Sequence, residues 1–272
     1  MIYFSDYAVG QHRLECPSCG RGGRDKTAGL KIDPEGSGVL NCFRCSYTES
    51  YVPDRGVAVR RAPTIKPKAQ VQQHHGLNDW GMALWQSTQN LSGVAAQYLR
   101  ARRCVVPPYG DLRWLPSLKH PSGHVGPALV ALITHVDTNA PLSLHRTWIT
   151  STGKADIENS RLLLGNHSIV GGVIRLTPDD EVASVLGIAE GIETALSLAH
   201  APLPVWATID AGHMSAFPAL MGISTLVIAV DNDPAGIAAA TSCADRWTDA
   251  GKTVLLTAQP ENDLNDSLGG VN

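Results

Sequence analysis

The sequence predicts an α/β protein in three parts: a small cysteine-bearing module, a mixed α+β middle segment, and a C-terminal domain built on a parallel sheet. Three observations lead to this fold class. Four of the six cysteines form two closely spaced pairs near the N-terminus. Residues 104–176 hold strand-like runs broken by Gly and Pro. After Pro178, apolar strand-like runs alternate with helical segments, which is the pattern of a parallel sheet with helical crossovers.

The N-terminal module carries a candidate metal site. Its cysteines follow a C-x2-C spacing twice, in the order Cys16, Cys19, Cys42 and Cys45. The two thiolates of one pair can reach a single ion, and two such pairs complete a tetrahedron around Zn²⁺. The stretch Gly29–Cys42 between the pairs is expected to form a hairpin. We therefore expect residues 1–54 to be a zinc ribbon. Redox use of one pair is the alternative, and the duplication of the pair argues against it.

The charge is distributed unevenly along the chain. Residues 1–68 carry 11 Lys/Arg against 7 Asp/Glu, residues 69–174 carry 8 against 5, and residues 175–272 carry 3 against 13. The basic first two-thirds is the natural surface for a polyanion. Within it, residues 55–76 combine Pro, Lys, Arg and Gln without periodicity, and predict a basic, extended linker.

The middle segment, residues 77–180, is expected to begin with two short helices. Asn78 and Ser92 precede apolar, helix-like runs and are candidate N-caps. Strand-like runs follow at Ala128–Val136, Pro141–Ile149 and Ser168–Leu176.

The C-terminal domain, residues 181–272, is expected to alternate strands and helices. Strands are predicted near residues 182–189, 204–210, 225–230 and 253–258. Helices are predicted near residues 192–200, 214–220 and 235–249, and Gly251 has the position of a helix-terminating glycine.

Carboxylates gather where these parallel strands end. Glu190 follows the first strand, and Asp231 and Asp233 follow the third. Open α/β sheets place their sites at this edge. Asp231 and Asp233 are two positions apart, so in strand geometry they would face the same side. Helix capping explains Asp233 alone but not the three acids together. Carboxylate oxygens suit Mg²⁺ or Mn²⁺, and we expect these residues to bind such an ion.

Two further acidic positions are less well defined by the sequence. Asp263 belongs to a third acidic patch near the C-terminus and is a candidate outer ligand of the same ion. Glu193 lies one helical turn after Glu190. For Glu193, a solvated first-turn acid and a functional role are equally compatible with the sequence.

The two acidic motifs resemble those of the Toprim domain. A strand followed by Glu190-Gly191 and a helix, then a strand followed by Asp231-x-Asp233-x-x-Gly236 and a helix, is the arrangement found in that family. It includes DnaG-type primases, topoisomerases and nucleases. The resemblance implies a Rossmann-like sheet, and it implies that Glu190, Asp231 and Asp233 bind Mg²⁺ for phosphodiester chemistry.

The order of the parts resembles that of phage and plasmid primases, in which a zinc ribbon and a basic segment precede Toprim. This resemblance implies that Lys154 and Arg146 lie near a triphosphate or a template strand. It also implies a DNA primase that makes short RNA primers from NTPs on single-stranded DNA. The chain contains no G-x4-G-K-[ST] phosphate loop, so a replicative helicase or other replication protein is expected in trans. The alternatives are a Toprim nuclease and a non-catalytic DNA-binding module.

The sequence also predicts a cytoplasmic protein without a membrane partner. The N-terminus lacks a basic start followed by a long apolar core, and no apolar run approaches the length of a membrane span. Cysteines at metal-ligand spacing fit a reducing compartment.

Overall fold

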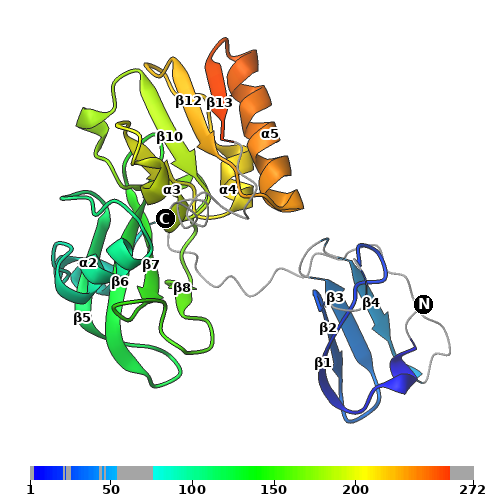
Figure 1. Cartoon of the computed structure of the whole chain (residues 1–272). Coiled ribbons are helices and arrows are strands. Elements are labelled where there is room, and N and C mark those ends of the chain that lie inside the picture. The colour runs from blue at the N-terminus through cyan, green and yellow to red at the C-terminus, as the bar shows by residue number, and fades with distance from the viewer. Residues whose placement is uncertain are drawn as a thin grey trace. The chain divides into compact units, whose positions relative to one another are not determined.

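The computed structural model describes residues 3–20, 22, 26–42, 45, 47–53 and 76–257 of the 272-residue chain. The chain divides into two compact units, Met1–Gln70 and Val71–Asn272 (Figure 1). Apart from Gly76, the predicted basic linker lies outside the described residues. The finer boundaries expected at residues 54, 76 and 180 stay predictions.

The N-terminal unit is built on a four-stranded antiparallel sheet in the order β1-β2-β3-β4. A short 3-10 helix precedes the strands, and the elements are η1 (Phe4–Asp6), β1 (Gly10–Leu14), β2 (Ala28–Ile32), β3 (Gly38–Cys42) and β4 (Thr48–Tyr51). Buried and more exposed residues alternate along β2 and β3, as expected when one face of a sheet covers a core. Leu30 and Leu40 lie in that core with Phe4. The pairing of β2 with β3 confirms the predicted hairpin.

The second unit contains one nine-stranded mixed sheet that runs through the middle segment and the C-terminal domain (Figure 1). Its order is β13-β12-β10-β11-β9-β6-β7-β8, and β5 pairs with β6. The strands are β5 (Leu112–Lys119), β6 (Val125–His135), β7 (Pro141–Trp148), β8 (Arg161–Leu163), β9 (Gly172–Arg175), β10 (Val185–Ala189), β11 (Val205–Ala207), β12 (Thr225–Ala229) and β13 (Thr253–Leu256). The sheet is continuous because β9 pairs antiparallel with β11 on one side and with β6 on the other. This continuity was not predicted from the sequence.

The α-helices of the described residues are α1 (Asp79–Gln86), α2 (Gly93–Ala101), α3 (Ile192–Leu198), α4 (Ala211–Ala216) and α5 (Pro234–Asp249). The Asn78 side chain accepts a hydrogen bond from the Gly81 N–H at 2.8 Å, which confirms the predicted cap of α1. Ser92 occupies the N-cap position of α2, but its side chain makes no capping hydrogen bond. None of the helices in the described part of the chain has the length and apolar character needed to span a bilayer.

The C-terminal domain shows the expected alternation, with β13, β12, β10 and β11 running parallel. Three elements of this domain differ from their predicted bounds by three or more residues. The strand expected over residues 182–189 begins only at Val185. The strand expected over residues 204–210 ends at Ala207, because Ile209 adopts a positive φ of 76°, which is incompatible with a strand. The helix expected over residues 214–220 instead spans Ala211–Ala216. It begins early because the Asp210 side chain accepts the His213 N–H at 2.9 Å and caps it.

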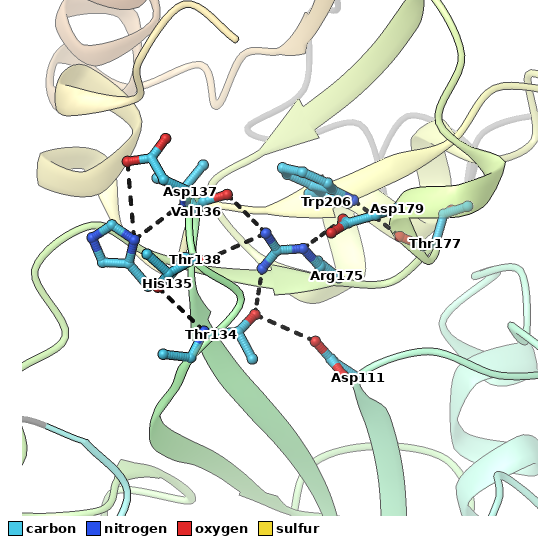
Figure 2. Close-up of polar contacts among 11 residues, drawn as sticks. Asp111, Thr134, His135, Val136, Asp137, Thr138, Arg175, Thr177, Asp179 and Trp206 are labelled. Carbon is cyan, nitrogen blue, oxygen red and sulfur yellow. Dashed lines mark hydrogen bonds and ion pairs between the residues drawn. The ribbon is translucent and has the colours of Figure 1, made fainter. Parts of the chain in front are cut away.

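A buried arginine holds the junction between the two halves of the sheet. Arg175, at the end of β9, is only 4% exposed. Figure 2 shows its guanidinium donating to the Asp179 carboxylate at 2.6 Å, to the Val136 carbonyl at 2.8 Å and to Thr134 Oγ1. The same group lies 4.6 Å from the ring centroid of Trp206 on β11. The charge of Arg175 is thus paired and hydrogen-bonded, as a buried charge requires. Through these contacts the Arg175 side chain links β9 to the neighbouring β6 and β11.

Candidate active site and metal centre

The four cysteines of the N-terminal unit are brought together. Their Sγ atoms all lie within 4.8 Å of one another, and no other group of three or more Cys, His, Asp or Glu in the described residues is as tight. The sulfurs of Cys16 and Cys45 are 3.7 Å apart, and those of Cys19 and Cys42 are 3.6 Å apart. A tetrahedron of sulfurs around zinc, with bonds of about 2.3 Å, has edges of about 3.8 Å. The cluster therefore fits Zn²⁺.

The second unit contains a cavity of about 290 Å³ beside the carboxyl ends of β10 and β12. Residues from the middle segment line it together with residues that follow β10, β11 and β12. Its charged lining residues are Arg102, Lys154, Arg161, Glu190, Glu193 and Asp231. The continuous sheet explains this meeting, because it fixes the middle segment against the C-terminal domain.

Glu190 and Asp231 form an acidic wall of the cavity. Glu190 directly follows β10, and Asp231 lies two residues after β12, the parallel neighbour of β10. Burial raises the pKa of Glu190, and the charges of Asp231, Asp233 and Asp210 raise it further. The ligand atoms of Glu190, Asp231 and Asp233 do not lie as close together as the four cysteine sulfurs, but their charges act on one another. Such mutual repulsion is relieved by a bound cation. The hard oxygen atoms of these carboxylates fit Mg²⁺ or Mn²⁺.

The two aspartates of the Asp-x-Asp motif have different local roles. The spacing of Asp231 and Asp233 suggests that they share one face of a strand. This prediction is wrong, because β12 ends at Ala229, before both residues. Asp231 lines the cavity, whereas the Asp233 side chain caps α5 by accepting the Gly236 N–H at 2.7 Å. The Asp233 N–H donates to the Asp231 carbonyl at 2.8 Å, which folds the two residues into a tight turn. Asp233 is nevertheless close enough for its charge to raise the pKa of Glu190.

Gly236 makes this turn sterically feasible. A Cβ atom at position 236 would lie 2.5 Å from the Asp231 carbonyl oxygen and 2.9 Å from the Asp231 Cβ. Both distances are shorter than real Cβ contacts. The absence of a side chain at Gly236 therefore permits a close backbone approach, and the partner is the backbone of Asp231.

Three cations, Arg102, Lys154 and Arg161, also line the cavity and form its cationic wall. Lys154 lies in the loop after β7, Arg161 begins β8, and Arg102 is the C-terminal cap residue of α2. His145 also lines the cavity, and burial lowers its pKa to about 4, with the nearby Arg161 and Arg146 charges lowering it too. The imidazole is therefore neutral near pH 7, and the positive charge comes from Lys and Arg.

Arg146 is not among the residues that line the cavity. His145 and Thr147 on either side of it do line the cavity, and side chains alternate between the two faces of a strand. The Arg146 guanidinium instead donates to the Leu163 carbonyl at 3.1 Å and lies 5.5 Å from the Trp148 ring centroid. Its role toward a triphosphate or template stays a prediction, and Arg161 is the cavity-lining arginine of this region.

Two acidic residues near the site were missed or left open by the sequence. Asp210 follows β11 and adds to the negative potential at Glu190, and its place after a strand was the available signal. Glu193 is a cavity residue with a side chain only 17% exposed, so it is not a solvated first-turn acid. Asp263 lies outside the described residues.

Comparison with known families identifies the two halves of the second unit. Residues 185–271 match a family described as a Toprim domain. Residues 75–176 match a family described as a domain of unknown function, DUF7146. No curated protein matches the chain.

Three solved structures resemble the chain at low sequence identity. The primase fragment of the bacteriophage T7 primase-helicase protein is 15% identical, with a TM-score of 0.47 over 96% of each chain. The zinc-binding and RNA polymerase domains of the Aquifex aeolicus primase are 13% identical, with a TM-score of 0.45 over 97% of this chain and 76% of that one. A complex of bacteriophage T7 lagging-strand DNA polymerase with primase domains bound to an RNA/DNA hybrid and dTTP gives 17% identity and a TM-score of 0.39, over 53% of this chain and 72% of that one.

Proposed function

We propose that this protein, which joins a four-cysteine zinc-binding unit to a Toprim domain, is a DNA primase that synthesises short RNA primers on single-stranded DNA from NTPs. The observation that carries the proposal is a single cavity lined both by the carboxylates Glu190 and Asp231 and by the cations Lys154, Arg161 and Arg102. Nucleotidyl transfer from an NTP needs a divalent metal ion and a separate set of cations for the phosphates. Both kinds of group face the same space of about 290 Å³.

On this proposal, Glu190, Asp231 and Asp233 hold Mg²⁺ or Mn²⁺. When bound, the ion would neutralise phosphate charge, lower the pKa of the attacking 3′-hydroxyl and stabilise the leaving pyrophosphate. Asp231 and Glu190 contribute from the cavity wall, and Asp233 contributes charge from the cap of α5. Asp263 is proposed as an outer carboxylate of the same centre.

The cationic wall is proposed to hold the triphosphate. Lys154 offers a compact ammonium group, and Arg161 offers a planar fork that suits two phosphate oxygens at once. The His145 ring is neutral because burial lowers its pKa. It therefore adds no positive charge that would repel a bound metal ion. These groups contribute binding and orientation rather than proton transfer.

The zinc-binding unit is proposed to engage the template strand. Its sequence mixes cations and aromatic residues around the cysteine pairs, which suits single-stranded nucleic acid. A replicative helicase or another replication protein is proposed as the partner in trans.

A primer-synthesis assay tests the catalytic proposal. Purified, zinc-replete protein is incubated with mixed-sequence single-stranded DNA, labelled NTPs and Mg²⁺, with and without a replicative helicase. We expect short labelled RNA from the wild-type protein. Replacing both Asp231 and Asp233 by Asn should lower synthesis by at least about a hundredfold, since charge stabilisation at the reacting centre is lost.

The control variant is Asp249→Asn, which removes one carboxylate from the exposed C-terminal end of α5 and should leave synthesis unchanged. Circular dichroism and urea unfolding verify that all variants are folded. Undiminished synthesis by the Asp231→Asn, Asp233→Asn protein would refute the metal assignment. Shortening of the DNA would identify a nuclease, and binding without either product would identify a non-catalytic module.

A further inference from the structure

Glu193 is the one cavity carboxylate that the proposed function does not use, and its surroundings are unusual for an acid near an anion site. Its carboxylate accepts a hydrogen bond from the Tyr98 hydroxyl. It also accepts from Arg102 Nε at 3.2 Å and lies 3.3–3.4 Å from the Lys154 ammonium nitrogen through both of its oxygens. Two of the three cavity cations are therefore bound to this one side chain.

We propose that Glu193 is a positioning residue that holds Lys154, with Arg102, at the cavity in the orientation that receives nucleotide phosphate. The proposal rests on the proposed function, because it assigns Lys154 to the phosphates of the NTP. Glu193 itself does not touch the nucleotide, and it acts through the cations that it holds.

The contacts of Glu193 join three elements that are far apart in the sequence. Tyr98 and Arg102 belong to α2 and its C-terminal cap, and Lys154 belongs to the loop between β7 and β8. Glu193 lies in the first turn of α3, three residues after Glu190. One short segment of the Toprim domain thus supplies a carboxylate to the acidic wall and the anchor of the cationic wall.

Burial and charge show that the anchor is ionised in the free protein. The Glu193 side chain is 17% exposed, against 32% for Lys154 and 33% for Arg102. Burial favours a raised pKa for Glu193, but Lys154, Tyr98 and Arg102 outweigh burial and lower it below the ordinary value. A lysine on a loop would otherwise sample many rotamers. Because Glu193 already restricts the Lys154 side chain in the folded protein, less side-chain entropy is lost when the nucleotide binds.

The test measures the reactivity of Lys154 and nucleotide binding together. An amine-acylating reagent is applied in limiting amount, and the modification of each lysine is followed by mass spectrometry, with the exposed Lys119 as internal reference. In the wild-type protein, Lys154 should react more slowly than Lys119, and ATP with Mg²⁺ should slow it further. In Glu193→Gln, Lys154 should react at least about threefold faster, and half-protection should need about tenfold more ATP, because a lysine that is not pre-ordered binds phosphate less well.

Primer synthesis supplies the second readout. We expect Glu193→Gln to raise the KM for NTP about tenfold while kcat changes less than about twofold. The phosphate contacts of Lys154 stabilise the bound substrate and the transition state equally, so their loss weakens binding and leaves the chemical step nearly unchanged. Lys154→Gln should show the same shift. In the Lys154→Gln background, the Glu193 substitution should add less than about twofold, as expected for two residues that act as one unit. Asp249→Asn is the control for loss of one negative charge.

The outcomes separate this proposal from the proposed function. A wild-type protein that makes no primers overturns primer synthesis, and the acylation experiment still decides the role of Glu193. Unchanged Lys154 reactivity in Glu193→Gln, failure of ATP to protect Lys154, or additive effects in the double variant would each overturn the positioning role. If Glu193→Gln does not fold, Glu193→Asp, which keeps the charge but draws it back from Lys154 by one methylene group, takes its place in both measurements with the same expected and contradicting results.

Discussion

At the scale of single residues, burial sets the ionisation of several groups in the second unit. Asp111 lies beside Thr134 in the network of Figure 2 and accepts a hydrogen bond from its hydroxyl at 3.5 Å. Burial raises the pKa of Asp111 to about 6, and the charge of Arg175 opposes this rise without cancelling it. The carboxyl group therefore titrates well above the ordinary value of 3.8.

This shift predicts a pH dependence of stability. Between about pH 4 and pH 6 the folded protein retains a proton on Asp111 that the unfolded chain has lost. Asp111 thus favours folding below pH 4, and this contribution is lost as the pH rises through 6. Replacing Asp111 by Asn removes this titration. The free energy of unfolding of the variant, taken relative to that of the wild-type protein, should therefore be higher at pH 7.5 than at pH 5. Urea unfolding at both pH values measures the difference.

The same experiment on Asp245→Asn provides the control, because Asp245 is an exposed residue of α5. This variant separates the effect of removing a buried carboxyl group from that of removing an exposed one. An Asp111→Asn difference that is constant from pH 5 to pH 7.5 would contradict the raised pKa of Asp111.

At the scale of secondary-structure elements, the turn from β12 into α5 decides where the Asp-x-Asp motif points. Pro234 begins α5, Asp233 caps it, and the Asp231 backbone packs directly against Gly236. Pro suits the first helical turn because its missing N–H is not needed there. The helix can approach the turn this closely only because position 236 has no side chain.

Gly236→Ala tests this packing. In an exposed helix the change would stabilise by about 1 kcal/mol, because Ala is the better helix former. Here the added methyl group meets the Asp231 backbone at 2.5 Å, so we expect a net loss of about 1–3 kcal/mol in the free energy of unfolding. Displacement of Asp231 should also lower primer synthesis. Urea unfolding and the primer assay measure both effects.

Gly165→Ala is the matched control, since a Cβ atom at position 165 would meet no atom within 4 Å. That variant should keep its stability within about 0.5 kcal/mol and retain full activity. A Gly236→Ala protein as stable as the wild-type protein would show that the turn can adjust to the methyl group.

At the scale of the whole molecule, the chain consists of two units with unequal means of stabilisation. The second unit has several clusters of buried apolar residues along its nine-stranded sheet. The N-terminal unit has a small core, and Cys16 and Cys42 are themselves part of it. A core of that size is marginal without a further constraint, and a metal bound by four cysteines supplies one.

Zinc removal should therefore unfold the N-terminal unit alone. With a zinc-selective chelator, hydrogen exchange should become fast at the amides of β2 and β3, while β10 and β12 keep their protection. Cys42→Ser should give the same pattern without a chelator, because it removes one ligand. Simultaneous loss of protection in both units would contradict their independence, and unchanged protection in β2 and β3 would contradict a structural role for zinc.

Short-range patterns explain why much of the architecture could be predicted. The cysteine spacing, the hairpin between the pairs and the Asn78 cap depend on neighbours in sequence, and all three are confirmed. The position of Glu190 and Asp231 at strand ends follows from the alternation of strands and helices. The exact ends of strands were less predictable. For this reason Asp231 and Asp233 were wrongly predicted to lie on a common strand face, although β12 ends at Ala229.

The four-cysteine site, the order of the parts and the positions of Glu190 and Asp231 at strand ends could be predicted, because each depends on local spacing or on a regular alternation. The way in which the middle segment meets the Toprim domain could not be predicted, since it depends on the pairing of β9 with strands from both. That arrangement brings Lys154 and Arg161 to the cavity and buries Glu193 beside Lys154 and Arg102. The alternation of side chains along β7 keeps Arg146 out of it. Contacts between residues some 40 to 95 positions apart leave no periodic trace in a single sequence, so they emerge only when the chain is folded.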